Sequence, residues 1–347
     1  MSRLALRRLT LSHFRSHARG AFGFAGAPVA IHGPNGSGKT NLIEAISLLS
    51  PGRGLRGAAA EEMARLPERI GWKIAAELEA PSGTHEVVTW SEGAGRRVEL
   101  DGKAAAQAAL GAVARVLWLT PAMDRLWLEG AAERRRFLDR ATLSLLPEHG
   151  AAALAYDRAL RERGRLLREG VRDPGWYAAL EARLAEEGAR IDAGRRAALA
   201  RLGAAPETPG FPRGDLALIA EGPRDPAGLR AALAEGRARD LAAGRTGIGP
   251  HRDDLGAVYA AKGMEARLCS TGEQKALLIG VVLANAWAVA EDFGAPPLLL
   301  LDEVAAHLDA DRRRALYGAI AGLGAQAFLT GTGPELFEGL EGERLAL

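Results

Sequence analysis

Cysteine is almost absent from this chain of 347 residues, in which Cys269 is the only one. An intrachain disulfide is therefore excluded, and such cysteine usage is typical of proteins from a reducing cytosol. Long hydrophobic runs are missing as well. The longest, Ala276–Ala290, is shorter than the ~20 residues that a membrane span needs, and it contains Gly280 and Asn285. This run predicts a buried core helix, so we expect no membrane partner.

The first residues also lack the features of a secretory signal. Met1–Arg19 is dotted with arginine and has no apolar central region. We therefore expect a cytoplasmic protein.

Lysine is scarce, although Lys and Arg together number 45 and the formal net charge is +2. The only lysines are Lys39, Lys73, Lys103, Lys262 and Lys275. One explanation is a GC-rich genome, whose codons favour Arg and Ala. The other is functional, because a guanidinium group binds phosphate through two parallel hydrogen bonds. The nearly neutral total leaves nucleic-acid binding open, since only a local basic face is needed.

A phosphate-binding loop lies near the N-terminus, between a predicted strand and a predicted helix. It follows the pattern G-x-x-x-x-G-K-T, in which glycines allow backbone N–H groups to surround phosphate oxygens. We expect Lys39 to approach the β- and γ-phosphates and the Thr40 hydroxyl to bind Mg²⁺. The residues expected to hold ATP are Gly33, Pro34, Asn35, Gly36, Ser37, Gly38, Lys39, Thr40 and the following Asn41.

The matching half of an ATP site lies near the C-terminus. The apolar run Leu298–Leu301 predicts a buried strand, and Asp302 and Glu303 follow it directly. An acidic residue at the end of a strand is common by itself, but together with the phosphate loop the pattern indicates catalysis. We expect Asp302 to hold Mg²⁺ and Glu303 to polarise the attacking water.

A third segment, Ser270–Gln274, precedes the long apolar helix. It reads S-T-G-E-Q, and at a helix start it offers a hydroxyl, free N–H groups and the positive end of the helix dipole. Read alone, it is a helix cap. Read shortly before Asp302, it resembles the signature motif of ABC-type ATPases, in which the signature of one subunit contacts the γ-phosphate bound by the other. The resemblance implies that Ser270, Gly272 and Gln274 bind nucleotide across a dimer.

The pattern along the chain predicts an α/β fold in which both chain ends build one lobe. We expect an ABC-type ATPase head with a mixed sheet from residues 1–125 and 245–347, and an inserted, mainly helical lobe from residues 126–244. The main strands are expected at Leu4–Leu11, Ala27–His32, Ile70–Leu78, Val113–Leu119 and Gln326–Thr330, and within His85–Leu100, which is interrupted by a turn at residues 93–95. Further helices are expected at Leu229–Leu241 and Asp311–Leu323.

Several further motifs, in order along nearly the whole chain, are similar to those of the RecF family of DNA-repair ATPases, within the wider SMC class. The motifs are Phe14-Arg15-Ser16-His17, residues 38–46 (GKTNLIEAI), 52–56 (GRGLR), 133–140 (ERRRFLDR) and 249–254 (GPHRDD). Asp302-Glu303 stands where an Asp-Asp pair is common in that family. Leu308-Asp309 resembles the D-loop of ABC-type ATPases, which implies that Asp309 contacts nucleotide. The ABC-type switch histidine and Q-loop glutamine are not evident; Thr330 stands at the end of the last predicted strand.

The resemblance implies a weak DNA-dependent ATPase that dimerises on ATP and acts in recombinational repair and replication. Its partners would be single-stranded or gapped DNA and junctions, the recombinase that it helps to load, and proteins of the RecR and RecO type. Slow turnover is expected because the two ABC elements are missing.

Arginines are the candidates for DNA contact. The resemblance and the phosphate chemistry of arginine point to Arg53, Arg56, Arg134 and Arg135. Each is also explained as a solvated helix residue or an intramolecular ion pair. Arg15 is expected at the nucleotide. The tryptophans, Trp90 among them, are expected to pack in the protein.

Two alternative functions remain open. A transporter-type ATPase subunit would couple to a membrane partner and leave DNA untouched. A chromosome-scaffolding relative of SMC proteins would need a coiled coil with heptads over several turns, which the sequence does not show.

Overall fold

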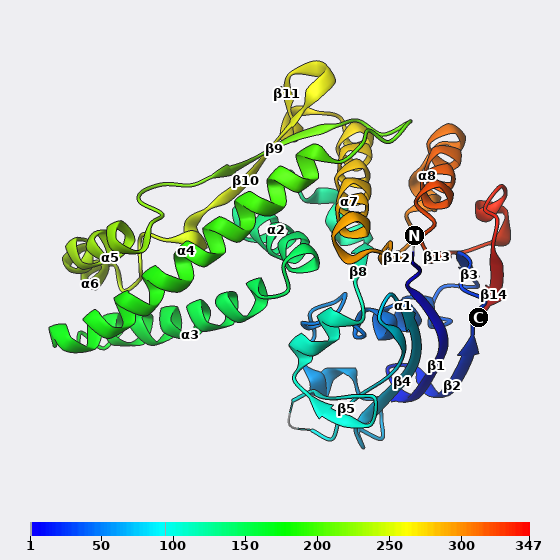
Figure 1. Cartoon of the computed structure of the whole chain (residues 1–347), viewed down its shortest axis with the longest axis horizontal. Coiled ribbons are helices and arrows are strands. Elements are labelled where there is room, and N and C mark those ends of the chain that lie inside the picture. The colour runs from blue at the N-terminus through cyan, green and yellow to red at the C-terminus, as the bar shows by residue number, and fades with distance from the viewer. Residues whose placement is uncertain (1, 94) are drawn as a thin grey trace. The chain divides into compact units, whose positions relative to one another are not determined.

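The structure is a computed structural model that describes residues 2–93 and 95–347 (Figure 1). The chain divides into two compact units. The first consists of Met1–Arg125, Ala204–Arg213 and Ser270–Leu347, and the second of Leu126–Gly203 and Gly214–Cys269.

A five-stranded parallel sheet forms the centre of the first unit. Its order is β14 (Glu343–Ala346), β3 (Val29–His32), β13 (Ala327–Gly331), β12 (Leu298–Leu301) and β8 (Val116–Leu119). The residues of β8 and β12 are all buried, which explains their continuous apolar sequence. The unit's helices are α1 (Lys39–Ser47), α7 (Thr271–Phe293) and α8 (Ala310–Leu323).

The second sheet of this unit is antiparallel and six-stranded. Its order is β2 (His17–Gly23), β1 (Ala5–Phe14), β4 (Trp72–Ala80), β5 (Gly83–Ser91), β6 (Arg97–Leu100) and β7 (Lys103–Ala105). The parallel and antiparallel strands thus form two sheets and not one mixed sheet. The strands expected within residues 85–100, on either side of a turn at 93–95, are β5 and β6. Residue 94 of that expected turn lies outside the described residues.

The segment between the second unit's two parts returns briefly to the first unit. Gly280 of α7 permits this approach, because a Cβ atom there would lie 2.6 Å from the carbonyl oxygen of Pro212. Gly210, at φ 83°, likewise lies against Ala315 of α8. Gly280 and Gly210 therefore both permit close packing.

The second unit contains five α-helices and a small sheet within the described residues. The helices are α2 (Ala131–Leu145), α3 (His149–Arg168), α4 (Pro174–Ala204), α5 (Pro226–Glu235) and α6 (Arg237–Ala243). The sheet has the order β11 (Met264–Glu265), β10 (Asp254–Tyr259) and β9 (Gly214–Ile219). The helix expected over residues 229–241 is broken at Gly236 into α5 and α6.

The structure divides the chain at a different place from the lobe boundary expected at residue 245. The chain passes from the second unit to the first between Cys269 and Ser270. The physical reason is strand pairing: β10 pairs along its whole length with β9, so the segment after residue 245 stays in the second unit.

A buried ion cluster holds the second unit together. The Arg163 side chain is fully buried and donates to Asp240 over 2.7 Å and to Glu181 over 3.1 Å. Arg237 gives Glu181 a second cation over 2.6 Å. These contacts join α3, α4 and α6, so the charges are balanced inside the unit.

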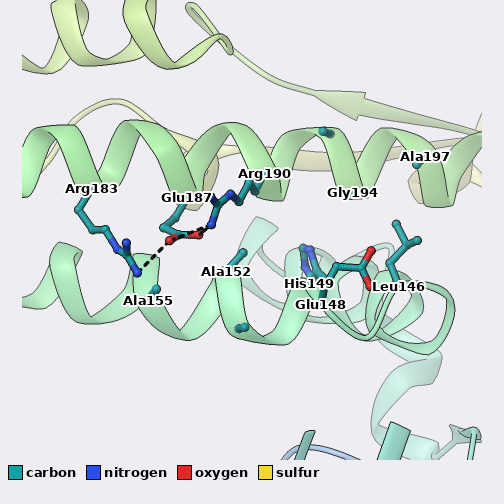
Figure 2. Close-up of a pocket in the computed structure, with 12 residues that line it drawn as sticks. Leu146, Glu148, His149, Ala152, Ala155, Arg183, Glu187, Arg190, Gly194 and Ala197 are labelled. Carbon is teal, nitrogen blue, oxygen red and sulfur yellow. Dashed lines mark hydrogen bonds and ion pairs between the residues drawn. The ribbon is translucent and has the colours of Figure 1, made fainter. Parts of the chain in front are cut away.

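A pocket of about 670 Å³ lies between α3 and α4 (Figure 2). Its lining is rich in small residues, including Ala152, Ala155 and Gly194. Glu187 forms ion pairs with Arg183 over 3.0 Å and with Arg190 over 3.2 Å. The three charged residues that α4 contributes to the lining are thus paired with one another.

Within the described chain, α7 is the one helix whose length and composition would allow it to cross a membrane. Its mean hydropathy in an 18-residue window is 1.6, and 67% of that window is buried inside the protein. Burial of this extent is that of a core helix, as the sequence predicted.

Candidate nucleotide site

The phosphate loop connects β3 to α1, as expected from its sequence. Gly38 is the N-terminal cap of α1 and has φ 103°, a left-handed conformation that favours glycine. A Cβ atom there would lie 3.0 Å from both Ser16 Oγ and His17 Nε2. Glycine is therefore required at this position for conformation and for space.

The two distant ATP motifs meet at Thr40 and Asp302. Thr40 Oγ1 donates to Asp302 Oδ1 over 3.1 Å, linking the first turn of α1 to the end of β12. Lys39 lies beside them, with Nζ donating to the carbonyl oxygens of Gly33 over 2.7 Å and of Pro34 over 2.9 Å. The side chain is buried, so its charge is held within the loop.

Thr330 connects both acidic residues that follow β12. Its hydroxyl donates to Asp302 Oδ1 over 2.8 Å and accepts from the backbone N–H of Glu303 over 2.9 Å. Glu303 has φ 53°, which is uncommon for a residue other than glycine. The hydroxyl thus supports an unusual backbone conformation at the residue expected to polarise water.

Burial raises the pKa of the Asp302 carboxyl, and the charge of Glu303 adds to this effect. The hydrogen bonds from Thr330 and Thr40 oppose it. A nearby cation would favour the ionised form in the same way.

The oxygens of Asp302 and Thr40 fit Mg²⁺, which prefers hard oxygen ligands and is usually bound through one or two protein groups together with phosphates and water. No group of three or more His, Cys, Asp or Glu side chains placed to hold a metal occurs in the described residues.

Glu44 of α1 is a residue to which the sequence reasoning gave no role. Its side chain is fully buried and accepts from Arg15 Nε over 2.9 Å, from Arg15 Nη2 over 2.7 Å and from Arg56 Nη1 over 2.8 Å. Arg56 also donates to Asn41 Oδ1 over 2.8 Å. Arg15, expected at the nucleotide, and Arg56, expected at DNA, are thus both bound to the phosphate-loop helix. The only signal was the position of Glu44 within residues 38–46.

Arg96 fixes the other end of α1. Its guanidinium donates to the carbonyl oxygens of Leu48 and Gly52, and to Thr89 Oγ1 over 2.8 Å. Burial lowers the pKa of Arg96 to about 10. These bonds hold the start of the 52–56 segment, in which Arg53 is exposed and has no hydrogen-bond or ion-pair partner within the described part of the chain.

The signature segment begins α7. Ser270 is the N-cap and forms a capping box with Glu273: the Ser270 N–H donates to Glu273 Oε2 over 2.9 Å, and Ser270 Oγ accepts from the Glu273 N–H over 3.4 Å. Gln274 is buried. The hydroxyl expected to act on a second subunit is therefore engaged in its own helix cap.

The D-loop residue Asp309 is the N-cap of α8 and accepts from the Arg312 N–H over 2.8 Å. Arg312 Nη1 donates to the carbonyl oxygen of Gly272 over 3.2 Å. Arg312 thereby joins the signature to the D-loop, which the sequence did not indicate.

Arg134 and Arg135, predicted to contact DNA, have intramolecular partners in the second unit. Arg134 binds both carboxylate oxygens of Asp254 over 2.7 Å. Arg135 Nη1 donates to the carbonyl oxygen of Asp253 over 2.6 Å. These bonds tie α2 to the first residue of β10 and to the residue before it, and they favour a structural role for both arginines.

Comparisons with known proteins agree with this architecture. The family model for the RecF/RecN/SMC N terminal domain matches residues 5–343. The chain is 49% identical to a DNA replication and repair protein RecF from Mesorhizobium japonicum, covering 96% of this chain and 93% of that protein. It is 48% identical to a RecF protein from Caulobacter sp., covering 100% and 97%.

Solved structures show the same fold. The structure of the recombination mediator protein RecF-ATPrS in the RecFOR pathway has a TM-score of 0.87 at 23% identity, covering 100% of this chain and 96% of that one. An Smc head domain with a coiled coil from Pyrococcus furiosus has a TM-score of 0.53 at 17% identity, with coverage of 97% and 92%. The predicted ABC-type head with an inserted lobe is thus confirmed as the fold class. The family match along nearly the whole sequence shows that the chain belongs to the RecF family.

Proposed function

We propose that the chain is an ATP-dependent DNA-binding protein of recombinational repair and replication, and that it acts in the cytoplasm. The observation that carries this proposal is the hydrogen bond between Thr40 and Asp302. It joins the phosphate loop to the acidic strand end, so two motifs far apart in the sequence form one nucleotide-binding centre. Family membership supports the role in DNA repair.

Each residue of the centre has a separate task in ATP binding. The phosphate-loop N–H groups and the Lys39 ammonium bind the phosphates, with Lys39 exchanging its carbonyl partners for phosphate oxygens. Thr40 and Asp302 would hold Mg²⁺, which supplies charge neutralisation at the β- and γ-phosphates. Glu303 accepts a hydrogen bond from water and orients it towards the γ-phosphate.

Hydrolysis is slow in this proposal. The side chain of Thr330 carries a hydroxyl, whereas the histidine of ABC-type ATPases would carry an imidazole. The hydroxyl orients Asp302 and Glu303 but adds no positive charge at the γ-phosphate. ATP then acts mainly as a reversible link between two copies of the chain, with Ser270, Gly272 and Asp309 of one copy facing the nucleotide of the other.

DNA is the proposed macromolecular ligand, as single strands, gaps or junctions. The exposed Arg53 is the predicted contact nearest in sequence to α1. Arg56, three residues further along, donates to Glu44 of α1. Proteins of the RecR and RecO type and a recombinase are the proposed partners, on the basis of the family alone.

Light scattering with and without ATP and Mg²⁺ tests the proposal. We expect the particle mass to double with ATP in the wild type and to remain that of one chain in Lys39→Ala. Lys39→Arg is the control, because it keeps the positive charge but replaces the ammonium group by a guanidinium of different geometry. A wild-type protein that binds ATP and keeps the mass of one chain would overturn the dimer proposal.

A further inference from the structure

The six-stranded antiparallel sheet carries a line of side chains across five neighbouring strands. The registers place Arg19 opposite Ser12, Ser12 opposite Lys73, Lys73 opposite Trp90, and Trp90 opposite Arg97. The line thus runs through β2, β1, β4, β5 and β6. The first four of these strands are labelled in Figure 1. Directly opposed residues in a sheet point to the same face. We call these five residues the basic row.

The basic row lies on the face that points away from the core. The neighbours of Lys73 in β4, Trp72 and Ile74, are buried in the core, as is Val98 beside Arg97. Arg19, Lys73 and Arg97 are exposed, and Trp90 is half-buried. Among the described residues, none of the three cations has an ion-pair partner.

Charge is distributed unevenly along this face. Two residues further along the strands the opposed set is Thr10, Ala75, Val88 and Glu99, and the next contains Arg8, Glu77 and Glu86. Positive charge is therefore concentrated in the basic row, and negative charge lies towards the other end of the strands.

The spacing suits a flexible polyanion. Strands lie 4.7–4.9 Å apart, so neighbouring cations of the row are separated by about 10 Å at the backbone. Long Lys and Arg side chains bridge the remaining distance to phosphates. The indole of Trp90 lies between Lys73 and Arg97, where a base could stack while its phosphates meet the cations.

We infer that the basic row is a binding surface for single-stranded DNA, with backbone phosphates on Arg19, Lys73 and Arg97 and a base stacked on Trp90. The inference rests on the proposed function and names a surface for it. It also revises the expectation that Trp90 only packs in the protein.

The first experiment measures binding of a fluorescent oligothymidylate by anisotropy over a range of salt concentrations. For single strands the slope of log K against log salt changes by about 0.7 per phosphate contact. The triple variant Arg19→Ala/Lys73→Ala/Arg97→Ala should bind about tenfold or more weakly at low salt, with a slope smaller by about 2. Single Arg97→Ala should reduce the slope by about 0.7, and its matched control Arg8→Ala, on the same face outside the row, should leave it unchanged.

The second experiment tests stacking. Trp90→Ala should weaken binding of the single strand about tenfold and Trp90→Phe much less, with little effect on a duplex of equal length. An equal loss on duplex and single strand in Trp90→Ala would overturn the assignment of Trp90.

The outcome separates this inference from the proposed function. Circular dichroism and ATP-dependent particle mass without DNA establish that the triple variant is folded and binds nucleotide. If the wild type binds DNA and the triple variant binds it equally with the same salt slope, the basic row is wrong and the proposed function stands. If the wild type binds no DNA at any salt concentration, both are wrong.

Discussion

Thr330 donates a hydrogen bond to Asp302 over 2.8 Å, and the same hydroxyl oxygen accepts the backbone N–H of Glu303 over 2.9 Å. One buried hydroxyl therefore binds the same Asp302 oxygen that accepts from Thr40, and it also stabilises the backbone that carries Glu303. A threonine at the end of β13 in this way couples two acidic residues that come from the end of β12.

Replacement of this hydroxyl should separate ATP binding from ATP turnover. Thr330→Val has nearly the same shape and removes both hydrogen bonds. We expect nucleotide affinity to change little, because Lys39 and the loop are untouched, and kcat to fall about tenfold or more because Glu303 is less well oriented. Nucleotide titration and steady-state phosphate release measure the two quantities.

Thr330→Ser is the matched control, since it keeps the hydroxyl, and it should retain most of the activity. A Thr330→Val enzyme with wild-type kcat would show that the hydroxyl has no role in positioning.

The signature serine can be tested against its own capping function. Ser270→Ala removes the hydroxyl and weakens the cap, and Glu273→Ala breaks the same capping box but keeps the hydroxyl. Each should cost about 1 kcal/mol of stability. Only Ser270→Ala should abolish the ATP-dependent doubling of particle mass in light scattering. Equal behaviour of the two variants would mean that Ser270 acts as a helix cap alone.

The buried cluster at Arg163 should dominate the stability of the second unit. Arg163→Met leaves Glu181 and Asp240 with less positive charge in a buried site, although Arg237 still pairs with Glu181. We expect a loss of about 3–5 kcal/mol in urea unfolding. Arg161→Ala changes an exposed arginine of the same helix and should stay within about 0.5 kcal/mol of the wild type. A small effect for Arg163→Met would contradict the assigned role.

Acid should destabilise the second unit through His251. Burial lowers the pKa of His251 below its ordinary value of 6.5. Its Nδ1 accepts from the Tyr156 hydroxyl over 2.7 Å, and Nε2 donates to the Thr246 carbonyl oxygen over 3.1 Å. The folded state thus favours the neutral imidazole ring of His251. The contribution of this ring to the free energy of unfolding is present above pH 6.5 and is lost as the pH falls through the lowered pKa.

Thermal unfolding of the wild type and of His251→Gln at about pH 7.5 and about pH 5.5 measures this contribution. The wild type should lose more stability between the two values than the variant, which cannot take up this proton. Parallel pH profiles would contradict the prediction.

Motifs with a local mechanism were predictable from sequence. The phosphate loop, the buried strand before Asp302 and the long helix after Ser270 depend on periodicity and on glycine conformation, which short segments express directly. The bounds expected for the strands over residues 27–32 and 326–330 and for the helix over residues 311–323 also agree closely with those of β3, β13 and α8.

Features that depend on pairing between distant segments were not predictable. The partners of Glu44 come from Arg15 and Arg56, which precede and follow it on separate loops. The division after Cys269 was not predicted because the place of β10 depends on its pairing with β9, a strand whose alternation was not recognised in the sequence. Gly236 was overlooked because a glycine inside a helical pattern is also compatible with one continuous helix.

The bonds of Arg96 have a mechanical consequence for α1. Its guanidinium donates to the carbonyl oxygen of Leu48, the C-cap of the helix that begins at Lys39. It also donates to the carbonyl oxygen of Gly52, which precedes Arg53. A displacement of Arg53 would therefore be transmitted to the C-terminal end of α1, because the intervening loop is fixed by these bonds. Lysine, with a single ammonium, could bind fewer of these carbonyl oxygens at once. Arg96→Lys would therefore weaken the connection between Arg53 and α1 as well as shorten the side chain.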